Sequence, residues 1–525
     1  MNSRMVLLII TLFGTFLIAE GTLFRKRYNP VKSIRMTLVA LVFLISLMVY
    51  FITLAPSFVG EDTAEYALQA SKLGLAHGPG YFFYIVLGKL FSLPFGTNVS
   101  YAMNLLSAVF SAGTVALLFL LINRFGGGDR LAFFLSLQFA FIPEFWFQAT
   151  KATPRNLCVT AGLLIFLWLQ KWYDRGFRVS EAMIILFCSG LMVGFNSQVL
   201  FIVPAIFLFL LLSSPPDAKS WRWRLLKYGV SFLVGLGIVF IVVILKARQE
   251  PPLGTYYIPV VPRFLYYAFS GKEWHFGFIG VSNVLWNWLK MLKFAFFSLG
   301  GVGFLIALYG GWATIRTFSA RNWFFLFLLG PLTALFNYAM QPHVYKGSFG
   351  QTNLFYACLI LWSAAGYDHL CKKNLVKPFV HAWVFILPLL TMITAWIGFS
   401  QKVAGIPKDA VRVDNRSNLR WVESTNYYLE RVPQGSILFT DWEQLTSIRY
   451  MQEVCGLRRD LQVFETRNGL WYATISIPVW KLYIKNNYRQ KPVFVTQIDS
   501  DLLKFANLMP FEDNLWRVSE KSGIN

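Results

Sequence analysis

Long apolar runs alternate with short polar segments over the first 400 residues of the chain. A helix needs roughly 20 apolar residues to cross the hydrocarbon layer of a bilayer, and runs of about this length predict about 11 or 12 spans. The first apolar run could be a signal peptide or an additional membrane helix. Ala19-Glu20-Gly21 lacks the small-x-small pattern of a cleavage site, which favours the additional helix. The predicted spans lie near residues 5–24, 37–59, 99–122, 131–149, 156–171, 181–195, 198–213, 228–246, 292–315, 322–340, 353–369 and 379–400.

The pattern changes after Gly405 to a mixture of polar and apolar positions. Some segments there have apolar residues at helical spacing, and others have the composition of short strands. They are the predicted helices Asn418–Val432 and Trp442–Glu453 and the predicted strands 436–440, 461–464 and 492–496. Strands that alternate with helices predict a small α/β domain. We therefore expect an α-helical polytopic membrane protein, with a multi-span domain over residues 1–400 and an extracytoplasmic α/β domain over residues 401–525.

Composition and charge support a membrane protein and argue against a nucleic-acid partner. Hydrophobic residues make up 56% of the chain and charged residues only 14%, which excludes a soluble globular protein. The net charge of +22 would suit nucleic acid, but the basic residues gather in every second loop between spans, as in cytoplasmic loops. The basic clusters are Arg25–Arg35, Arg124 and Arg130, Lys171–Arg178, Lys219–Lys227, Arg316 and Arg321, and Lys372–Lys377.

This orientation places the remaining loops and the tail on the other side of the membrane. They are the loop from Gly60, the stretches 150–156, 247–291 and 341–352, and the chain after residue 400. We expect an integral protein of the bacterial inner membrane, with these segments extracytoplasmic. The five cysteines show no paired spacing, so no disulfide or zinc framework is predicted.

Ionisable residues cluster in the first external loop, where they are costly at a membrane boundary. Asp62 and Glu65 lie three positions apart, so a helix from Thr63 would place both carboxylates on one face. Two such carboxylates suit a general base or a divalent cation site. The alternative is a capping box in which Asp62 and Glu65 only support the helix start. His77 precedes Gly-Pro-Gly and is equally typical of a turn, and residues 81–95 predict an interfacial amphipathic helix.

Four segments follow one another from the first external loop into the next predicted span: Gly60-Glu61-Asp62-Thr63-Ala64-Glu65, then Leu73-Gly74-Leu75-Ala76-His77-Gly78-Pro79-Gly80-Tyr81, then Leu93-Pro94-Phe95-Gly96, then Asn104-Leu105-Leu106-Ser107-Ala108. Together they resemble the N-terminal signature of the protein O-mannosyltransferase-like membrane proteins, which has an Asp-x-x-Glu loop, a His-Pro-Pro-Gly-like turn and an Asn-Leu-x-Ser-Ala helix. The tail is similar to that family's extracytoplasmic segment over Gly435–Asp441, Arg449–Val454, Gly456–Leu461 and Trp471-Tyr472.

The resemblance implies a glycosyltransferase of the GT-C architecture that takes its sugar from a lipid-phosphate donor. It also implies that Asp62 is catalytic, with Glu65 and His77 beside it. Asp62 would act as a base or as a carboxylate bound to a divalent cation, Mg²⁺ or Mn²⁺. The expected partners are a polyprenyl-phosphate sugar, a protein or glycan acceptor, and membrane lipid.

Transfer from such a donor leaves a negatively charged phosphate, which calls for cationic side chains at the outer membrane face. Arg263 is the first candidate, because its loop is the longest external one between spans and is rich in tyrosine. Weaker candidates are Lys151, Arg155, His343 and Lys346. The family usually has an acidic residue and a tyrosine where this chain has Lys151 and Arg155. Each cation has a simpler alternative role in contacting lipid headgroups.

These observations favour a membrane glycosyltransferase that moves a sugar from a polyprenyl-phosphate donor to a protein hydroxyl or a glycan. A lipid or polysaccharide transporter is one alternative, but the predicted span centres look uncharged apart from Glu144 and Lys293 near external ends. A noncatalytic assembly protein that binds partners through its tail is the other.

The orientation is testable by cysteine labelling. Cysteines introduced near Ser71 and Ser500 should both react with a membrane-impermeant reagent applied from the noncytoplasmic side, because both lie outside the basic loops. Labelling of only one of the two would contradict the predicted topology.

Overall fold

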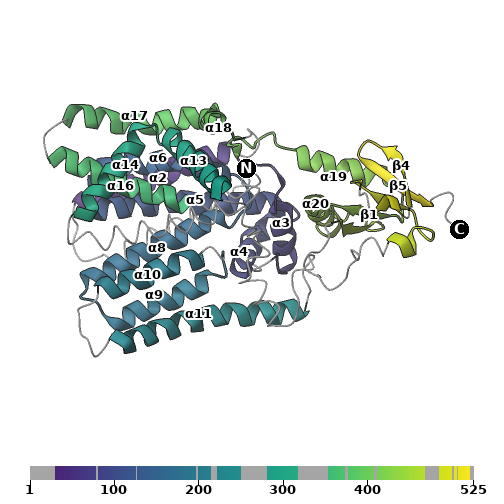
Figure 1. Ribbon diagram of the computed structural model, residues 1–525, viewed down its shortest axis with the longest axis horizontal. Coiled ribbons are helices and arrows are strands. Elements are labelled where there is room, and N and C mark those ends of the chain that lie inside the picture. Colours follow the sequence, from purple (N-terminus) through teal and green to yellow (C-terminus); the bar gives the residue numbers. More distant parts are fainter. Residues whose placement is uncertain are drawn as a thin grey trace.

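The computed structural model of the chain describes residues 30–520, except 78–80, 126, 197–198, 214–220, 250–280, 317–352, 373–376, 407–410, 467–483, 499–501 and 505. Its helices pack side by side in a bundle, and a small sheet extends from one end of that bundle (Figure 1). This arrangement confirms the predicted fold class. The described bundle helices are α2 Pro30–Ile52, α5 Val99–Arg124, α6 Gly128–Ala140, α7 Pro143–Ala149, α8 Arg155–Asp174, α9 Val179–Met192, α10 Val199–Ser213, α11 Trp221–Gln249, α13 Val281–Ser298, α14 Val302–Arg316, α16 Asn353–Lys372 and α17 Lys377–Trp396.

Within the described residues, three helices are long and apolar enough to cross a membrane unaided: α2, α5 and α11. Two bent pairs, α6 with α7 and α13 with α14, raise this number to five if each pair forms one span. The predicted spans 5–24 and 322–340 lie outside the described residues. The total of 11 or 12 spans therefore stays a prediction.

Two predicted spans are broken, and the residues at each break explain it. The prediction of a single helix over 292–315 is wrong, because a bend of 108° separates α13 from α14. Gly300 and Gly301 form this bend with φ values of +70° and +63°, a region that favours glycine. The span predicted over 131–149 bends by 70° where Pro143 opens α7, since proline lacks the N–H that a continuing helix needs.

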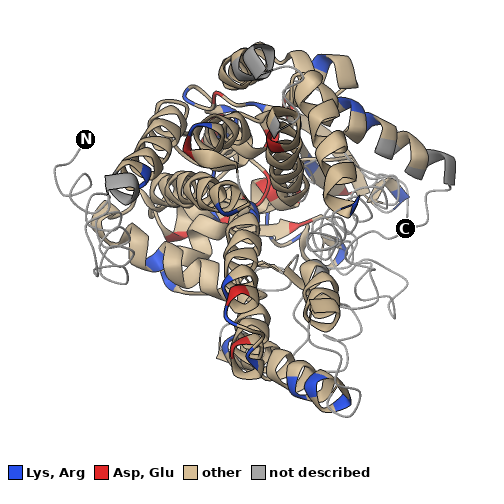
Figure 2. Cartoon of the chain, turned by 90° about the vertical axis from the view of Figure 1, so that its left-hand side faces the viewer, with Lys and Arg blue, Asp and Glu red and all other residues tan. Residues whose placement is uncertain are grey.

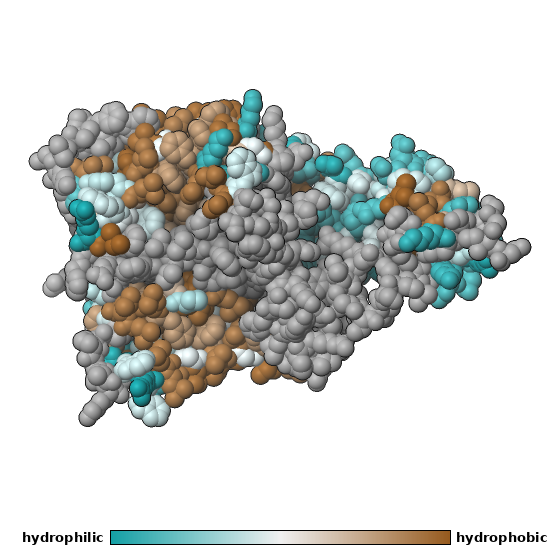
Figure 3. Space-filling model, viewed as in Figure 1, coloured by the Kyte–Doolittle hydropathy of each residue, from teal (hydrophilic) through white to brown (hydrophobic). Residues whose placement is uncertain are grey.

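The bundle has the surface of a membrane-embedded protein. Brown apolar side chains cover much of its visible face, whereas the sheet domain is mostly hydrophilic (Figure 3). Met48 on α2, Leu233 on α11 and Leu305 on α14 are 64%, 61% and 58% exposed. Apolar exposure on this scale is stable only against lipid or another protein.

Several helix termini with basic residues lie at the end of the bundle that points away from the sheet. Figure 2 views this end, with lysine and arginine in blue. Arg124 at the end of α5 faces Asp174 at the end of α8, and Arg35 near the start of α2 bonds Asp129 at the start of α6. The described basic residues Arg35 and Arg124 therefore share one end of the molecule, and the assignment of that end to the cytoplasm stays a prediction.

Three short helices occupy the opposite end, between the bundle and the sheet (Figure 1). They are α3 Thr63–Lys72, α4 Phe82–Ser92 and the 3₁₀ helix η1 Leu93–Phe95. The predicted helix over 81–95 corresponds to α4 and η1 together. All of α3 from Thr63 to Ala70 is buried, so the helix that follows Asp62 is packed inside the protein.

The C-terminal part is a five-stranded mixed sheet with helices packed on it. The strand order is β2-β1-β3-β5-β4, in which β1 pairs in parallel with β2 and β3 while β5 pairs antiparallel with β3 and β4. The elements are α18 Phe399–Ala404, α19 Arg420–Arg431, β1 Ile437–Thr440, α20 Trp442–Glu453, β2 Gln462–Glu465, β3 Val493–Val495, η6 Leu502–Lys504, β4 Ala506–Glu512 and β5 Leu515–Glu520.

Helix α20 joins this domain to the bundle by packing on α3. The Tyr450 hydroxyl donates to the Thr97 carbonyl at 3.0 Å and accepts from the Ser100 N–H at 3.2 Å. Lys72 at the end of α3 pairs with Glu453 at the end of α20 at 3.1 Å. The sheet domain is therefore fixed directly over the first loop, which positions the candidate site.

Helices α9 and α11 cross in close contact through glycine, which makes a sharp stability test possible. A Cβ at Gly235 would lie 2.2 Å from the Phe187 carbonyl oxygen, whereas one at Gly237 would meet nothing within 4 Å. We expect Gly235→Ala to destabilise the protein by about 1–3 kcal/mol, because the helices must separate. Gly237→Ala is the matched control and should leave the thermal unfolding temperature unchanged or slightly raised. Equal effects of the two substitutions would contradict the described packing.

Candidate active site

Two loops that carry candidate residues are fastened to α5 by one side chain. Asn104 is fully buried, and its amide nitrogen donates to the carbonyls of Ala55 and Ser57 at 2.9 Å each. Its amide oxygen accepts from the N–H of Ala152 at 2.7 Å. Buried backbone groups need such partners, so Asn104 holds both loops in one place. The Asn-Leu-x-Ser-Ala segment found in the sequence therefore has a structural role.

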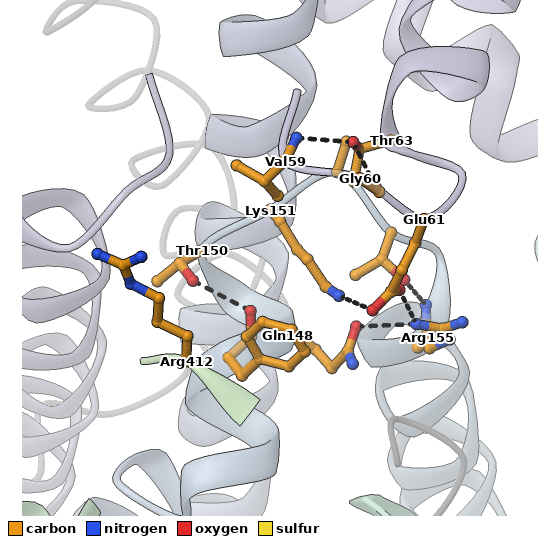
Figure 4. Close-up of polar contacts among 12 residues, drawn as sticks. Val59, Gly60, Glu61, Thr63, Gln148, Thr150, Lys151, Arg155 and Arg412 are labelled. Carbon is orange, nitrogen blue, oxygen red and sulfur yellow. Dashed lines mark hydrogen bonds and ion pairs between the residues drawn. The ribbon is translucent and has the colours of Figure 1, made fainter. Parts of the chain in front are cut away.

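The turn before α3 is closed by Thr63 and leaves the Asp62 carboxylate available. The Thr63 hydroxyl donates to the Gly60 carbonyl at 2.8 Å and accepts from the Val59 N–H at 3.0 Å (Figure 4). Asp62 occupies the N-cap position, but its side chain makes no capping hydrogen bond. The capping-box interpretation of Asp62 and Glu65 is therefore wrong.

Asp62, Glu65 and His77 meet in space. One ligand atom from each lies within 4.8 Å of the others. Glu65 accepts two hydrogen bonds from His77, from the backbone N–H at 2.6 Å and from Nδ1 at 2.5 Å. The other ring nitrogen, Nε2, lies 3.8 Å from Oδ2 of Asp62. Glu65 thus orients the imidazole ring, and the ring presents Nε2 to Asp62.

Aromatic rings surround this imidazole. Tyr66, Tyr81 and Trp442 have ring centroids 6.1, 5.4 and 6.2 Å from that of His77. Glu65 is 1% exposed, and its burial raises the pKa of its carboxyl against the opposing effect of His77. Nδ1 of His77 is therefore held by a buried carboxyl, in an enclosed setting that favours short polar contacts.

Two tryptophans of the sheet domain contact the first loop. Trp442 at the start of α20 donates from Nε1 to Oδ1 of Asp62 at 3.3 Å. Trp421 on α19 packs against Gly60, where an added Cβ would lie 2.2 Å from the indole nitrogen. The candidate site is therefore shared between the bundle and the sheet domain.

Glu61, one residue before Asp62, forms a partly buried ion cluster with two cations (Figure 4). Its carboxylate accepts from Lys151 Nζ at 2.6 Å and from Arg155 Nη1 at 2.7 Å. The lysine side chain is 1% exposed, and its ammonium also lies 3.7 Å from the centroid of the Phe147 ring. Both cations come from the loop and helix start that Asn104 holds beside the first loop.

The electrostatics of this cluster keep Glu61 ionised. Burial alone would raise the pKa of Glu61, but Lys151 and Arg155 outweigh it and lower that pKa to about 2. Burial lowers the pKa of Lys151 to about 8, even though Glu61 opposes this shift. The lowered pKa of Glu61 favours its charged form, whereas the lowered pKa of Lys151 disfavours the charged form of the lysine. Glu61 also has Arg155 as a second partner. Its carboxylate therefore stays charged whether or not the lysine is protonated.

The three-residue group around Asp62 fits a divalent cation. It supplies two carboxylates and one imidazole, donors that suit Mn²⁺ and, for the carboxylates, Mg²⁺. Two ligand atoms of one such ion are about 3 to 4 Å apart. The separation of 3.8 Å between Asp62 Oδ2 and His77 Nε2 meets this requirement. Glu65 would then support the imidazole from behind.

The structure brings together some of the residues that the sequence singles out. Asp62, Glu65 and His77 form one group, and Lys151 and Arg155 form the neighbouring cluster. The other candidates, Arg263, His343 and Lys346, lie outside the described residues. Two described cavities lie elsewhere, one beside Trp396 and Arg412 and the other between α6 and α16.

Sequence reasoning missed three participants in the site. Glu61 was not predicted as a site residue, because only its acidic neighbours Asp62 and Glu65 match the Asp-x-x-Glu motif. It is nevertheless a charged residue of the same loop, which the sequence shows. Trp442 lies 380 positions from Asp62, so no local pattern connects them. Asn104 could have been found, because a polar residue inside a predicted span usually has a buried partner.

Comparisons with known proteins agree with this architecture. The family model of the protein O-mannosyl-transferase TMEM260 N-terminal domain matches residues 62–219, which begin at Asp62. The protein O-mannosyl-transferase tmem260 of Dictyostelium discoideum is 20% identical over 505 residues, covering 86% of this chain and 60% of that protein. The protein O-mannosyl-transferase TMEM260 of Mus musculus is 34% identical over 127 residues, covering 23% of this chain and 18% of that protein.

Solved structures show the same fold. ArnT from Cupriavidus metallidurans bound to undecaprenyl phosphate has a TM-score of 0.54 and 12% identity, covering 92% of this chain and 98% of that one. Its apo state has a TM-score of 0.51 and 11% identity, covering 91% and 97%. The chain is therefore an integral membrane protein of the GT-C fold.

Within that class, its sequence is protein O-mannosyltransferase-like, which confirms the resemblance found in the sequence. The chain spans about 60% of the length of the Dictyostelium relative. The two named relatives come from eukaryotes, so the bacterial inner membrane stays a prediction.

The ion cluster should make stability depend on acid pH. The ordinary pKa of 4.5 for Glu61 falls to about 2 on folding, so between these values the unfolded chain binds more protons than the folded one. The stabilisation by Glu61 is present above pH 4.5 and is lost as the pH falls towards 2. Wild type should therefore unfold at a higher temperature than Glu61→Gln near neutral pH, and the gap should narrow below about pH 4.5.

The exposed pair of Glu181 with Arg175 at the far end of the bundle supplies the control. Surface pairs contribute little, so Glu181→Gln should change the unfolding temperature only slightly across the same range. A Glu61→Gln gap that does not depend on pH would contradict the assigned ionisation.

Proposed function

We propose that this chain is a membrane glycosyltransferase that moves a sugar from a polyprenyl-phosphate donor to a hydroxyl of a protein or glycan acceptor. The observation that carries the proposal is the meeting of Asp62, Glu65 and His77 beside two cations, of which Lys151 is buried and Arg155 is partly buried. The resemblance to protein O-mannosyl-transferases supports the reaction class, and the ArnT structure with undecaprenyl phosphate supports the class of donor.

In this reaction the acceptor oxygen attacks the anomeric carbon of the sugar as the bond from that carbon to the phosphate oxygen breaks. The phosphate leaves with the bonding electron pair, and because the acceptor attacks from the opposite face, the configuration at carbon is inverted. Asp62 takes the proton of the acceptor hydroxyl. Trp442 donates a hydrogen bond to Oδ1 of Asp62, and Oδ2, which lies 3.8 Å from Nε2 of His77, is the oxygen that would face the acceptor.

The remaining groups stabilise charge and geometry. Glu65 fixes the ring of His77, and this ring presents Nε2 on the same side as Oδ2 of Asp62. Lys151 and Arg155 supply the positive charge that a departing phosphate needs in an enclosed site. Arg263, Lys346 and His343 remain further proposed partners of the donor phosphate.

A divalent cation is a second proposed role for the same group. Asp62 and His77 would hold the ion, with Glu65 behind the imidazole, and the ion would supply positive charge next to the phosphate. Loss of transfer after chelation, with recovery on adding Mn²⁺ or Mg²⁺, is the expected result for this role. Transfer that survives chelation assigns Asp62 to proton transfer alone.

The proposal predicts that Asp62→Asn nearly abolishes transfer from a polyprenyl-phosphate sugar. Asparagine keeps the shape of the side chain but cannot accept the proton, and losing a general base typically costs about 100-fold to 10,000-fold in rate. Turnover of purified protein with a polyprenyl-phosphate mannose donor and a hydroxyl acceptor measures this loss.

The matched control is Asp441→Asn. Asp441 does cap a helix, since its side chain accepts from the Gln444 N–H at 2.9 Å, and asparagine caps as well as aspartate. This variant should turn over like wild type. If Asp62→Asn also kept wild-type turnover, the site would have no catalytic carboxylate, and the noncatalytic assembly protein would become the better interpretation.

A further inference from the structure

The Glu61 cluster has more hydrogen-bond donors than its own carboxylate uses. Beside Arg155 lies Gln148, whose amide oxygen accepts from Nη1 of that arginine at 3.4 Å (Figure 4). Gln148 is fully buried, and its amide nitrogen has no hydrogen-bond partner among the described residues. A buried donor left in this state is costly, typically about 1–3 kcal/mol, and a ligand oxygen that accepted from it would remove this cost.

Three donors therefore converge on one small volume. The ammonium of Lys151 and the guanidinium of Arg155 meet at the Glu61 carboxylate. The third donor, the amide nitrogen of Gln148, belongs to the side chain that lies beside Arg155 and turns its oxygen to that arginine. Together with the buried setting, this set suits an oxyanion with several acceptor oxygens. A single carboxylate from Glu61 satisfies only part of it.

The backbone of Glu61 has an unfavourable conformation. Its φ is +50°, in the left-handed region that side chains other than glycine rarely adopt, and it follows Gly60 at φ +93°. Strain of this kind persists only where the surroundings compensate for it, and here the compensation is the pair of bonds to the two cations. A competing anion would remove that compensation and release the loop.

We propose that Lys151, Arg155 and Gln148 form a phosphate-binding site and that Glu61 is a built-in competitor, which fills the site when no phosphate is bound and is displaced by the donor phosphate. This inference rests on the proposed function, because it names what occupies the donor-phosphate site before the donor arrives. Two negative charges cannot share the cluster without strong repulsion, so binding of the phosphate and release of Glu61 are one event. Glu61 is the neighbour of Asp62, the proposed base. The backbone beside Asp62 therefore changes only when a donor phosphate displaces Glu61.

The test is the affinity of the purified full-length chain for farnesyl phosphate, measured by calorimetry in lipid nanodiscs. Glu61→Gln removes the competing charge and should tighten binding about tenfold, because the free site no longer has to release an ion. Lys151→Met should weaken binding about tenfold, and Gln148→Leu should weaken it several-fold. Farnesol, which lacks the phosphate, should bind equally to all four proteins.

Inorganic phosphate is the second probe and distinguishes the two sources of the anion. If Glu61→Gln binds both farnesyl phosphate and inorganic phosphate more tightly, the site recognises the phosphate alone. If only farnesyl phosphate gains affinity, the prenyl chain contributes to recognition. Both results support displacement, whereas unchanged or weaker farnesyl phosphate binding in Glu61→Gln overturns it and makes the cluster purely structural.

Glu61→Asp keeps the inference falsifiable if the glutamine variant folds poorly. It retains the charge but shortens the side chain by one methylene, so its farnesyl phosphate affinity should lie between those of wild type and Glu61→Gln. An affinity equal to or below that of wild type would count against displacement. Glu181→Gln, which removes an acidic partner at the far end of the bundle, should bind as wild type does.

These measurements separate the inference from the proposed function, because they need no sugar transfer. Inactive Asp62→Asn together with unimproved binding in Glu61→Gln would remove only the inference. Tighter binding in Glu61→Gln together with wild-type turnover in Asp62→Asn would remove only the proposed catalytic role.

Discussion

The site depends on one constraint: two irregular loops enter the buried end of a helical bundle, and their backbone groups must find partners there. Asn104 meets this need by bonding Ala55 and Ser57 in one loop and Ala152 in the other. Ser107, one turn further along α5, accepts from the Thr153 N–H at 3.2 Å. Irregular backbone at such depth is tolerated only when its polar groups are satisfied inside the protein. The polar positions of α5 therefore set where the first loop can lie.

The same constraint sets the electrostatics. Because the two loops share one support, the acidic first loop is held against the basic start of α8, and opposite charges meet at 2.6 and 2.7 Å. One acidic residue, Glu61, pairs with both cations, while Asp62 next to it faces His77 and Trp442 instead. Two adjacent carboxylates thus have different surroundings and different tasks, which a sequence pattern of acidic residues cannot distinguish.

Local patterns predicted much of this fold, and long-range contacts account for most of what they missed. Helix α20 begins and ends where its spacing predicts, at Trp442 and Glu453. Strands β1 and β3 fall within the predicted strands, and β2 is shifted by one residue from its prediction. Strands β4 and β5 were missed, because neither alternates polar and apolar residues and most of their side chains are at least partly exposed. The convergence of Asp62 with Glu65 follows from helical periodicity. The pairing of Glu61 with Lys151 does not, since 90 residues separate them.

The contact between Trp442 and Asp62 gives the chain an order of assembly. The carboxylate and the indole that holds it are 380 positions apart, with most of the bundle between them. During synthesis the first loop is therefore made long before Trp442. Asp62 lacks its hydrogen bond from Trp442 until the tail has folded onto α3. A truncated or stalled chain would contain every bundle residue of the site and still lack its finished geometry. The geometry of the site is thus complete only after the tail of the polypeptide has folded onto α3.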